Sequence, residues 1–263
     1  MPRRLAALLF PLLALATGAA AASEPGWIAE DPAGISGPAT VPVGEAAMTF
    51  GFGQTQARSG RARGTSVGAV EVEAGIAPRL DLRFAQALGY GRAGGRLDES
   101  EAPAWGGLSQ LGLRVEVAEQ QGWLPAFGLL TLARTEYGSF RPMQEVEAVA
   151  LFAAALQDGP NPLTAHLNLA YATRLDPEPG ERPGRYGVRA AVSQAVTPAT
   201  LVGLTWLNEQ GERGEHDANL LLASARHRLA DNLILGAEIG TGVGPEGPAF
   251  VAGLSLKWIL GGR

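Results

Sequence analysis

The stretch FVAGLSLKW, residues 250–258, decides the fold of this chain. Every second residue from Phe250 to Trp258 is apolar, and the residues between them, from Val251 to Lys257, are small or polar. A period of two residues is typical of a β-strand with one apolar face. The stretch therefore predicts a strand near the C-terminus. It leaves open whether a protein core or lipid covers the apolar face.

Length and composition bound the class of protein. The chain has 263 residues, enough for one large domain or two small ones. It has no cysteine, and this excludes disulfides, thiolate metal sites and a lipoprotein anchor. The formal net charge of −5 argues against a nucleic-acid partner, because proteins that bind nucleic acids usually carry a basic surplus.

The first 22 residues have the pattern of a secretory signal peptide. Arg3 and Arg4 form its positive start, residues 5–16 form its apolar segment, and the alanines at 20–22 offer a cleavage site. A retained membrane anchor is the alternative, but the apolar run is shorter than the roughly 20 residues that a spanning helix needs. No later stretch approaches that length. We therefore expect an exported chain without spanning helices.

From Ala46 onward the sequence divides into segments of about ten residues. In 108–119, for example, aliphatic residues at positions 111, 113, 115 and 117 alternate with Gln, Gly, Arg and Glu. Residues 146–157 are almost wholly apolar and taken alone would also suit a helix, and a leucine triplet interrupts the alternation in 217–229. The predicted strands are 46–56, 66–76, 80–90, 108–119, 124–136, 146–157, 163–175, 185–195, 201–210, 217–229, 233–243 and 249–260.

The connections between these segments alternate in length. Short links rich in Pro, Gly, Asn and Asp, such as 77–79 and 230–232, suit hairpin turns. Longer polar links lie between them, and all of these would fall at the opposite end of the strands. Short turns at one end and long loops at the other are the plan of a bacterial outer-membrane barrel. Twelve, an even number, also fits that plan.

A soluble β-sandwich or soluble barrel is the alternative for an exported all-β chain. A soluble barrel would turn its apolar face inward, and its links would have no reason to alternate in length. The sequence therefore predicts an all-β fold, a closed antiparallel up-and-down transmembrane barrel of about 12 strands over residues 46–260. Residues 23–45 form a Pro/Gly-rich periplasmic lead-in, and their position suggests a partial plug of the lumen.

In a membrane barrel the apolar faces of the strands contact lipid and the charged faces line the lumen. The sequence does not decide the orientation of Trp206. It shares a strand face with Val202 and Leu204, and this face can point toward lipid or toward the lumen. The lumen charges have two interpretations. They either pair and hydrate to stabilise a polar interior, or they form a constriction that selects a solute. The candidate lumen residues are Glu71, Glu73, Arg83, Arg114, Glu116, Arg134, His166, Arg174, Arg189, Glu238 and Lys257.

No pattern of catalytic residues is present in the sequence. His216 lies in an acidic loop, His227 lies between two arginines, and His166 has no serine placed beside it on its face. No metal-ligand spacing and no phosphate-binding GxxxxGK[ST] motif occurs. We therefore expect no enzyme activity and no cofactor, with an outer-membrane lipid-modifying enzyme as a less favoured alternative.

Two parts of the chain resemble known proteins. Residues 34–55, GISGPATVPVGEAAMTFGFGQT, resemble the opening of the outer-membrane transporter family named for the meta-pathway of phenol degradation. That resemblance implies passage of small, often hydrophobic or aromatic, compounds across the outer membrane. The last strand is similar to the closing strand that the barrel assembly machinery recognises, with Gly253, Leu256 and Trp258 at the matching positions and Val251 where a polar residue is usual.

The expected function is therefore a channel or transporter in the outer membrane of a Gram-negative cell. The expected partners are outer-membrane lipid, the barrel assembly machinery and a small solute that the sequence does not identify. A structural or surface-interaction barrel, whose long loops bind a partner, is the main alternative.

Overall fold

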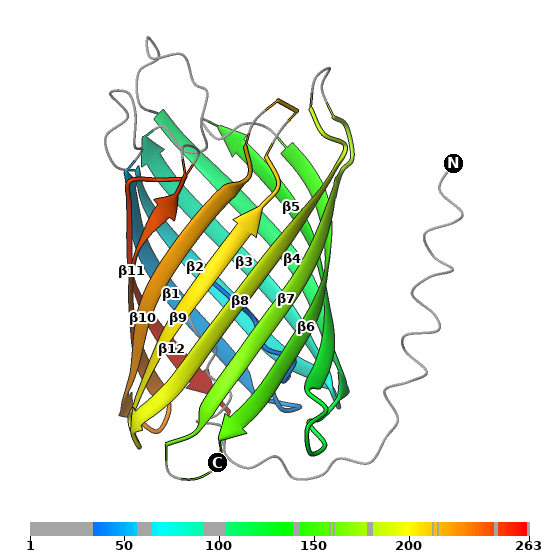
Figure 1. Ribbon diagram of the computed structural model, residues 1–263. Coiled ribbons are helices and arrows are strands. Elements are labelled where there is room, and N and C mark those ends of the chain that lie inside the picture. Colours follow the sequence, from blue (N-terminus) through cyan, green and yellow to red (C-terminus); the bar gives the residue numbers. More distant parts are fainter. Residues whose placement is uncertain are drawn as a thin grey trace, which may run out of the picture.

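The computed structural model describes residues 34–56, 65–91, 104–138, 143–157, 159, 161–177, 181–211, 213–214, 216–244 and 247–261. The predicted signal peptide, 1–22, and the first part of the lead-in, 23–33, lie outside these residues. The described chain forms one closed antiparallel β-barrel (Figure 1). The predicted fold class is confirmed.

Twelve strands form the barrel, and each pairs with its neighbour in the sequence. The strand over 143–157 excludes a helix there. The described part of the chain contains no helix long and apolar enough to cross a membrane. The strands are β1 (Ala46–Gln56), β2 (Thr65–Ala77), β3 (Leu80–Gly91), β4 (Ala104–Ala118), β5 (Ala126–Gly138), β6 (Met143–Gln157), β7 (Leu163–Arg174), β8 (Gly184–Thr197), β9 (Thr200–Glu209), β10 (Ala218–Ala230), β11 (Leu233–Val243) and β12 (Phe250–Leu260).

The stretch FVAGLSLKW begins β12 and closes the barrel. β12 pairs with β11 on one side and with β1 on the other, where Leu256 lies opposite Phe50 and Lys257 opposite Thr49. Because β1 and β12 pair over their whole length, neither strand presents an open edge.

The links separate into two ends, although the alternation is less strict than the sequence suggests. Three links contain only two residues each, 78–79, 198–199 and 231–232, and all lie at the end where the C-terminus lies (Figure 1). The link between β5 and β6 is only 139–142, although a long loop was predicted there. The prediction was wrong at this point because both strands extend further than the alternating pattern indicates.

The outer face of the barrel is apolar. Phe84 is 47% exposed, whereas Asp81, on the opposite face of the same strand, is 0% exposed. Trp206 is exposed on the outside together with Val202 and Leu204, which settles its orientation. A closed barrel with an apolar exterior has the surface of a protein that lipid surrounds.

The inner face is not charged throughout, contrary to the expected separation of apolar outside from charged inside. Leu130 and Leu132 of β5 and Val149 and Leu151 of β6 point inward, and Leu151 is 0% exposed. Leu222 of β10 is also buried inside, which explains the leucine triplet. An apolar residue on both faces of a strand produces the continuous apolar run that made 146–157 ambiguous.

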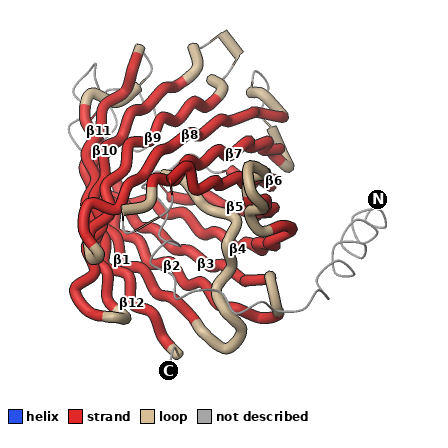
Figure 2. The backbone as a smooth tube through the Cα atoms, turned by 60° about the horizontal axis from the view of Figure 1, so that its bottom comes forward, coloured by secondary structure: helices blue, strands red, loops and turns tan. Residues whose placement is uncertain are grey.

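Residues 34–42, here called the plug, cross the interior of the barrel (Figure 2). A Cβ placed on Gly34 would lie 3.1 Å from the Leu222 side chain of β10, and one on Gly128 of β5 would lie 3.0 Å from Pro38. The chain then leaves the interior at Val43, which forms a parallel bridge with Gly75 of β2. Residues 34–42 of the lead-in therefore occupy the lumen.

Candidate functional site

A first group of charges lies on the inner face of β2, β3 and β4, and is here called the plug cluster. Strand register creates it, because Glu73 lies opposite Arg83 and Asp81 opposite Arg114. Arg114 Nη2 lies 2.6 Å from Asp81 Oδ2, and Arg83 Nε lies 2.9 Å from Glu73 Oε1. Buried charges persist in proteins when they are paired in this way. Glu71 completes the cluster by pairing with Arg83.

The same side chains hold the plug. The backbone N–H of Val41 donates a hydrogen bond to Asp81 Oδ2 at 3.1 Å. Arg83 Nη1 donates to Ser36 Oγ at 3.1 Å, and Arg114 Nη1 donates to the Gly37 carbonyl at 3.4 Å. Each contact gives a hydrogen-bond partner to a polar group of the plug inside the barrel. The plug cluster is therefore an anchor for the segment that narrows the lumen.

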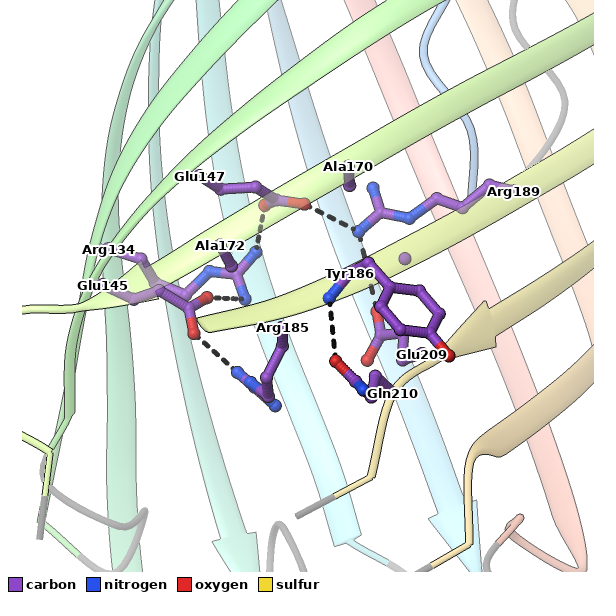
Figure 3. Close-up of a pocket in the computed structure, with 11 residues that line it drawn as sticks. Arg134, Glu145, Glu147, Ala170, Ala172, Arg185, Tyr186, Arg189, Glu209 and Gln210 are labelled. Atoms are coloured by element: carbon purple, nitrogen blue, oxygen red, sulfur yellow. Dashed lines mark hydrogen bonds and ion pairs between the residues drawn. The ribbon is translucent and has the colours of Figure 1, made fainter. Parts of the chain in front are cut away.

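A second group, here called the loop-side cluster, lies toward the end that carries the longer loops (Figure 3). Glu145 and Glu147 of β6 form its centre. Arg185 Nη2 lies 2.6 Å from Glu145 Oε2, and Arg134 Nη2 lies 3.1 Å from Glu147 Oε2. Arg189 Nη2 lies 3.3 Å from Glu147 Oε1. The two glutamates, both almost fully buried, therefore join arginines from β5 and β8 into one network across three strands.

Sequence reasoning missed Glu145 and Glu147, although a signal was present. They occupy alternate, inward-facing positions in β6, whereas Val146 and Ala148 take the outward-facing positions next to them. This period of two was hidden because the apolar inner residues further along the strand made the whole segment look uniform. Arg226 was missed for the same reason, since the leucine triplet of β10 obscured its face.

The structure places every predicted lumen residue on an inward-facing position of its strand, and it gathers them into different groups. Glu71, Glu73, Arg83 and Arg114 belong to the plug cluster, and Lys257 Nζ lies 4.0 Å from Glu73. The others take separate places. Arg134 and Arg189 meet in the loop-side cluster, Arg174 pairs with Glu181, Glu116 accepts a hydrogen bond from the Thr40 backbone, and His166 is buried on β7.

A cavity of about 280 Å³ lies between the plug and the wall formed by β1, β2, β10, β11 and β12. Gly34 of the plug contributes to its lining, and Arg226 and Glu238 are the charged residues among the described ones that line it. Its volume is close to the lower bound of about 300 Å³ that is usual for small-molecule sites. The lumen therefore keeps space for a small solute beside the plug.

The histidines lie apart from one another. His166 is buried inside the barrel. His227 is on the outer side, where its Nδ1 lies 3.0 Å from Thr200 Oγ1. Within the described ranges, no three His, Asp or Glu side chains are arranged to hold a metal ion.

On β12, Leu256 and Trp258 face outward and are 37% and 46% exposed, while Gly253 lies on the inner face beside Glu238.

Comparisons with known proteins give likenesses of fold. No family model matches the chain, and no curated protein matches it. The solved structure of the COG4313 outer membrane channel from Pseudomonas putida F1 is similar with a TM-score of 0.60 and 14% identity, over 88% of this chain and 100% of that one. The KdgM porin is similar with a TM-score of 0.54 and 8% identity, over 81% and 98%. Both comparisons agree with the fold of a closed β-barrel.

Proposed function

We propose that this chain is an outer-membrane channel that passes small solutes through its lumen. The observation that carries the proposal is a closed barrel with an apolar exterior, a charged interior and a cavity of about 280 Å³ beside the plug. An apolar exterior is stable in contact with lipid, and a charged interior is stable in contact with water and polar solutes. The names of the two similar solved structures, an outer membrane channel and a porin, support the same function.

The plug makes the proposed channel narrow. It crosses the lumen from Gly34, beside Leu222 of β10, to β3 and β4, where charged side chains hold it through the contacts of Ser36, Gly37 and Val41. A 12-stranded barrel stands between small filled barrels and wide porins even without a plug. Solutes that pass must therefore be small, unless the plug moves.

The finer parts of the proposal come from the sequence. The resemblance of residues 34–55 to the family named for the meta-pathway of phenol degradation adds hydrophobic or aromatic compounds as the solute class. The signal-peptide pattern of 1–22 supports export, and Gly253, Leu256 and Trp258 support recognition by the barrel assembly machinery. We propose no catalytic role for His166, because a lipid-modifying enzyme would need this histidine on the lipid side, and it lies inside.

A structural or surface-interaction barrel is the second candidate, and the loop-side cluster favours it. Three arginines and two buried glutamates pair across the inner wall near the longer loops, and such a network can close a lumen as well as select solutes. In that case the lumen would carry no flux, and the long loops would carry the function.

Conductance separates the two candidates. The purified chain is placed in planar bilayers and in liposomes, and a form that lacks residues 24–40 is measured beside it. A channel conducts ions and swells liposomes in a small solute, and loss of the plug raises the conductance. Absence of flux from both forms, with the barrel folded, would favour the structural candidate. Equal conductance from both forms would show that the plug does not limit passage.

A further inference from the structure

The space inside the barrel lies on one side of the plug. Inner positions of β5 to β9 are mostly buried, as Leu132, Val149 and Thr205 illustrate. Inner positions of β1 and β12, such as Gly51 and Ser255, remain partly accessible. The cavity of about 280 Å³ lies on this second side. A solute that crosses the lumen with the plug in place therefore has room beside β1 and β12.

Glycines create this room. Gly51 and Gly53 of β1 and Gly236 of β11 all lie on the cavity wall and contribute no side chain to it. The charged side chains lie in the space that glycines free. A Cβ on Gly236 would be 3.3 Å from Arg226 Nη1, and one on Gly253 would be 2.6 Å from Glu238 Oε1. Both charges thus lie at the wall and border the open space.

The two charges have opposite sign and a fixed spacing. Arg226 lies opposite Gly236 in the pairing of β10 with β11, and Glu238 is two residues further along β11. Such diagonal neighbours have Cα atoms roughly 7–8 Å apart. Arg226 is near enough to act electrostatically on the Glu238 carboxylate. An ion of one sign is attracted by one group and repelled by the other, whereas a solute with both charges is attracted by both.

We propose that the solute path runs through this cavity and that Arg226 and Glu238 make it selective for small zwitterions. The carboxylate of the zwitterion would face the Arg226 guanidinium, and its ammonium group would face the Glu238 carboxylate. The inward-facing wall beside the charges is formed by the small residues Ser224, Gly236, Gly253 and Ser255, so it would accommodate the body of a small solute. This inference rests on the proposed channel function and adds to it a route and two specificity-determining residues. In place of the hydrophobic or aromatic compounds that the sequence resemblance implies, it gives small zwitterions as the solute class.

Substitutions at two glycines test the route without disturbing the wall. A Cβ on Gly51 would have its nearest atom at 3.8 Å and one on Gly53 at 3.6 Å, so larger side chains fit the backbone and point into the cavity. We expect Gly51→Leu and Gly53→Leu to lower the conductance at least threefold. Gly68→Leu is the matched control, because Gly68 is on the outer face of β2 and a Cβ there meets nothing within 4 Å.

A cysteine variant gives a second test that does not depend on folding with a bulky residue. The chain has no cysteine, so Gly51→Cys introduces a unique thiol. We expect a methanethiosulfonate reagent, added to the open channel in a bilayer, to reduce the current through this variant. The wild-type channel should be unaffected by the same reagent.

Charge-removing variants test the selectivity. We expect Glu238→Gln to shift the cation-to-anion permeability ratio toward anions by roughly fivefold, and Arg226→Gln to shift it toward cations by a similar factor. Liposome swelling in alanine, relative to swelling in the uncharged sugar arabinose, should fall in both variants. Permeability ratios that do not change would remove these residues from the selectivity, and an unchanged alanine-to-arabinose ratio would overturn the zwitterion as solute.

Different experimental results would contradict the proposed route and the proposed channel function. A conducting wild type, with Gly51→Leu and Gly53→Leu that conduct equally and a Gly51→Cys that does not respond to the reagent, would overturn the route alone. A wild type that does not conduct, together with a plug-deleted form that does not conduct, would overturn the channel function and the route with it.

Discussion

Asp81 Oδ2 accepts hydrogen bonds from the backbone N–H of Val41 at 3.1 Å and from Arg114 Nε at 2.9 Å. One carboxylate oxygen thus connects the plug to the barrel wall. Asp81 is 0% exposed, so water does not replace either bond. The position of the plug therefore depends on a side chain at the start of β3.

Asp81→Ala should release the plug. The substitution removes the acceptor for Val41 and the closer carboxylate of Arg114, at 2.6 Å, and leaves Glu73 at 3.4 Å. Because Glu73 remains, the cost is below the roughly 3–5 kcal/mol of a buried charge left without any partner. We expect a higher and noisier single-channel conductance in planar bilayers. Glu119→Ala, which removes the exposed pair with Arg79 at 2.7 Å, is the control and should leave conductance unchanged. Quiet, wild-type currents from Asp81→Ala would contradict an anchoring role.

Gly75→Leu should displace the plug without removal of a charge. A side chain at Gly75 would collide with the backbone carbonyl oxygens of Val41 and Pro42, and a collision with backbone is not relieved by a rotamer change. We expect a rise in conductance similar to that of the form without residues 24–40. Protection of the plug from added protease should fall in parallel. If the variant keeps both wild-type conductance and protease protection, the plug does not pass Gly75 in the membrane.

Glu147→Gln should make the lumen prefer anions. Glu147 pairs with both Arg134 and Arg189, so its neutralisation leaves two guanidiniums with less compensation. A change of about fivefold in the anion-to-cation permeability ratio is the size that one partly solvated charge supplies. Reversal potentials in a salt gradient give this ratio. Glu209→Gln is the control, because the Glu209 side chain is 56% exposed and its charge is screened by salt.

Leu256→Arg should prevent assembly of the barrel, whereas Lys257→Ala should not. Leu256 faces outward on β12, where an arginine near the middle of a bilayer costs about 2–4 kcal/mol. Lys257 faces inward with its Nζ 4.0 Å from Glu73, so its removal changes at most the ion preference. Heat-modifiable migration on a gel measures the folded fraction of each variant. Equal folding of both would reverse the assignment of inside and outside.

The alternation of residues predicted much of the fold. In 108–119 and 250–258 the apolar positions lie on the outer face as a membrane barrel requires, and the strand boundaries agree within a few residues. The prediction was weaker for 146–157 and 217–229, where Leu151 and Leu222 are buried inside the lumen. A period-two pattern reports only a contrast between the faces of a strand. It is lost when both faces are apolar.

The candidate site was predicted in part for the same reason. Strand direction and period place Glu73, Arg83 and Arg114 on one face, and this can be read from local sequence. Their grouping depends on the register between strands, which opposes Glu73 to Arg83 and Asp81 to Arg114. Glu145 and Glu147 were missed because their alternation occupies too short a stretch to stand out from the alanines around it.

The sequence by itself determined the twelve strands, the closed all-β class and, outside 146–157 and 217–229, the side of the strands that carries charge, because these follow from a period of two residues that most of the strands display. Only the tertiary structure decided where the plug lies and which charges meet. The contact of Arg114 with Gly37 joins residues 77 positions apart, and that of Arg185 with Glu145 joins residues 40 apart. Such contacts arise when the sheet closes, since closure brings into one lumen side chains that no local pattern relates.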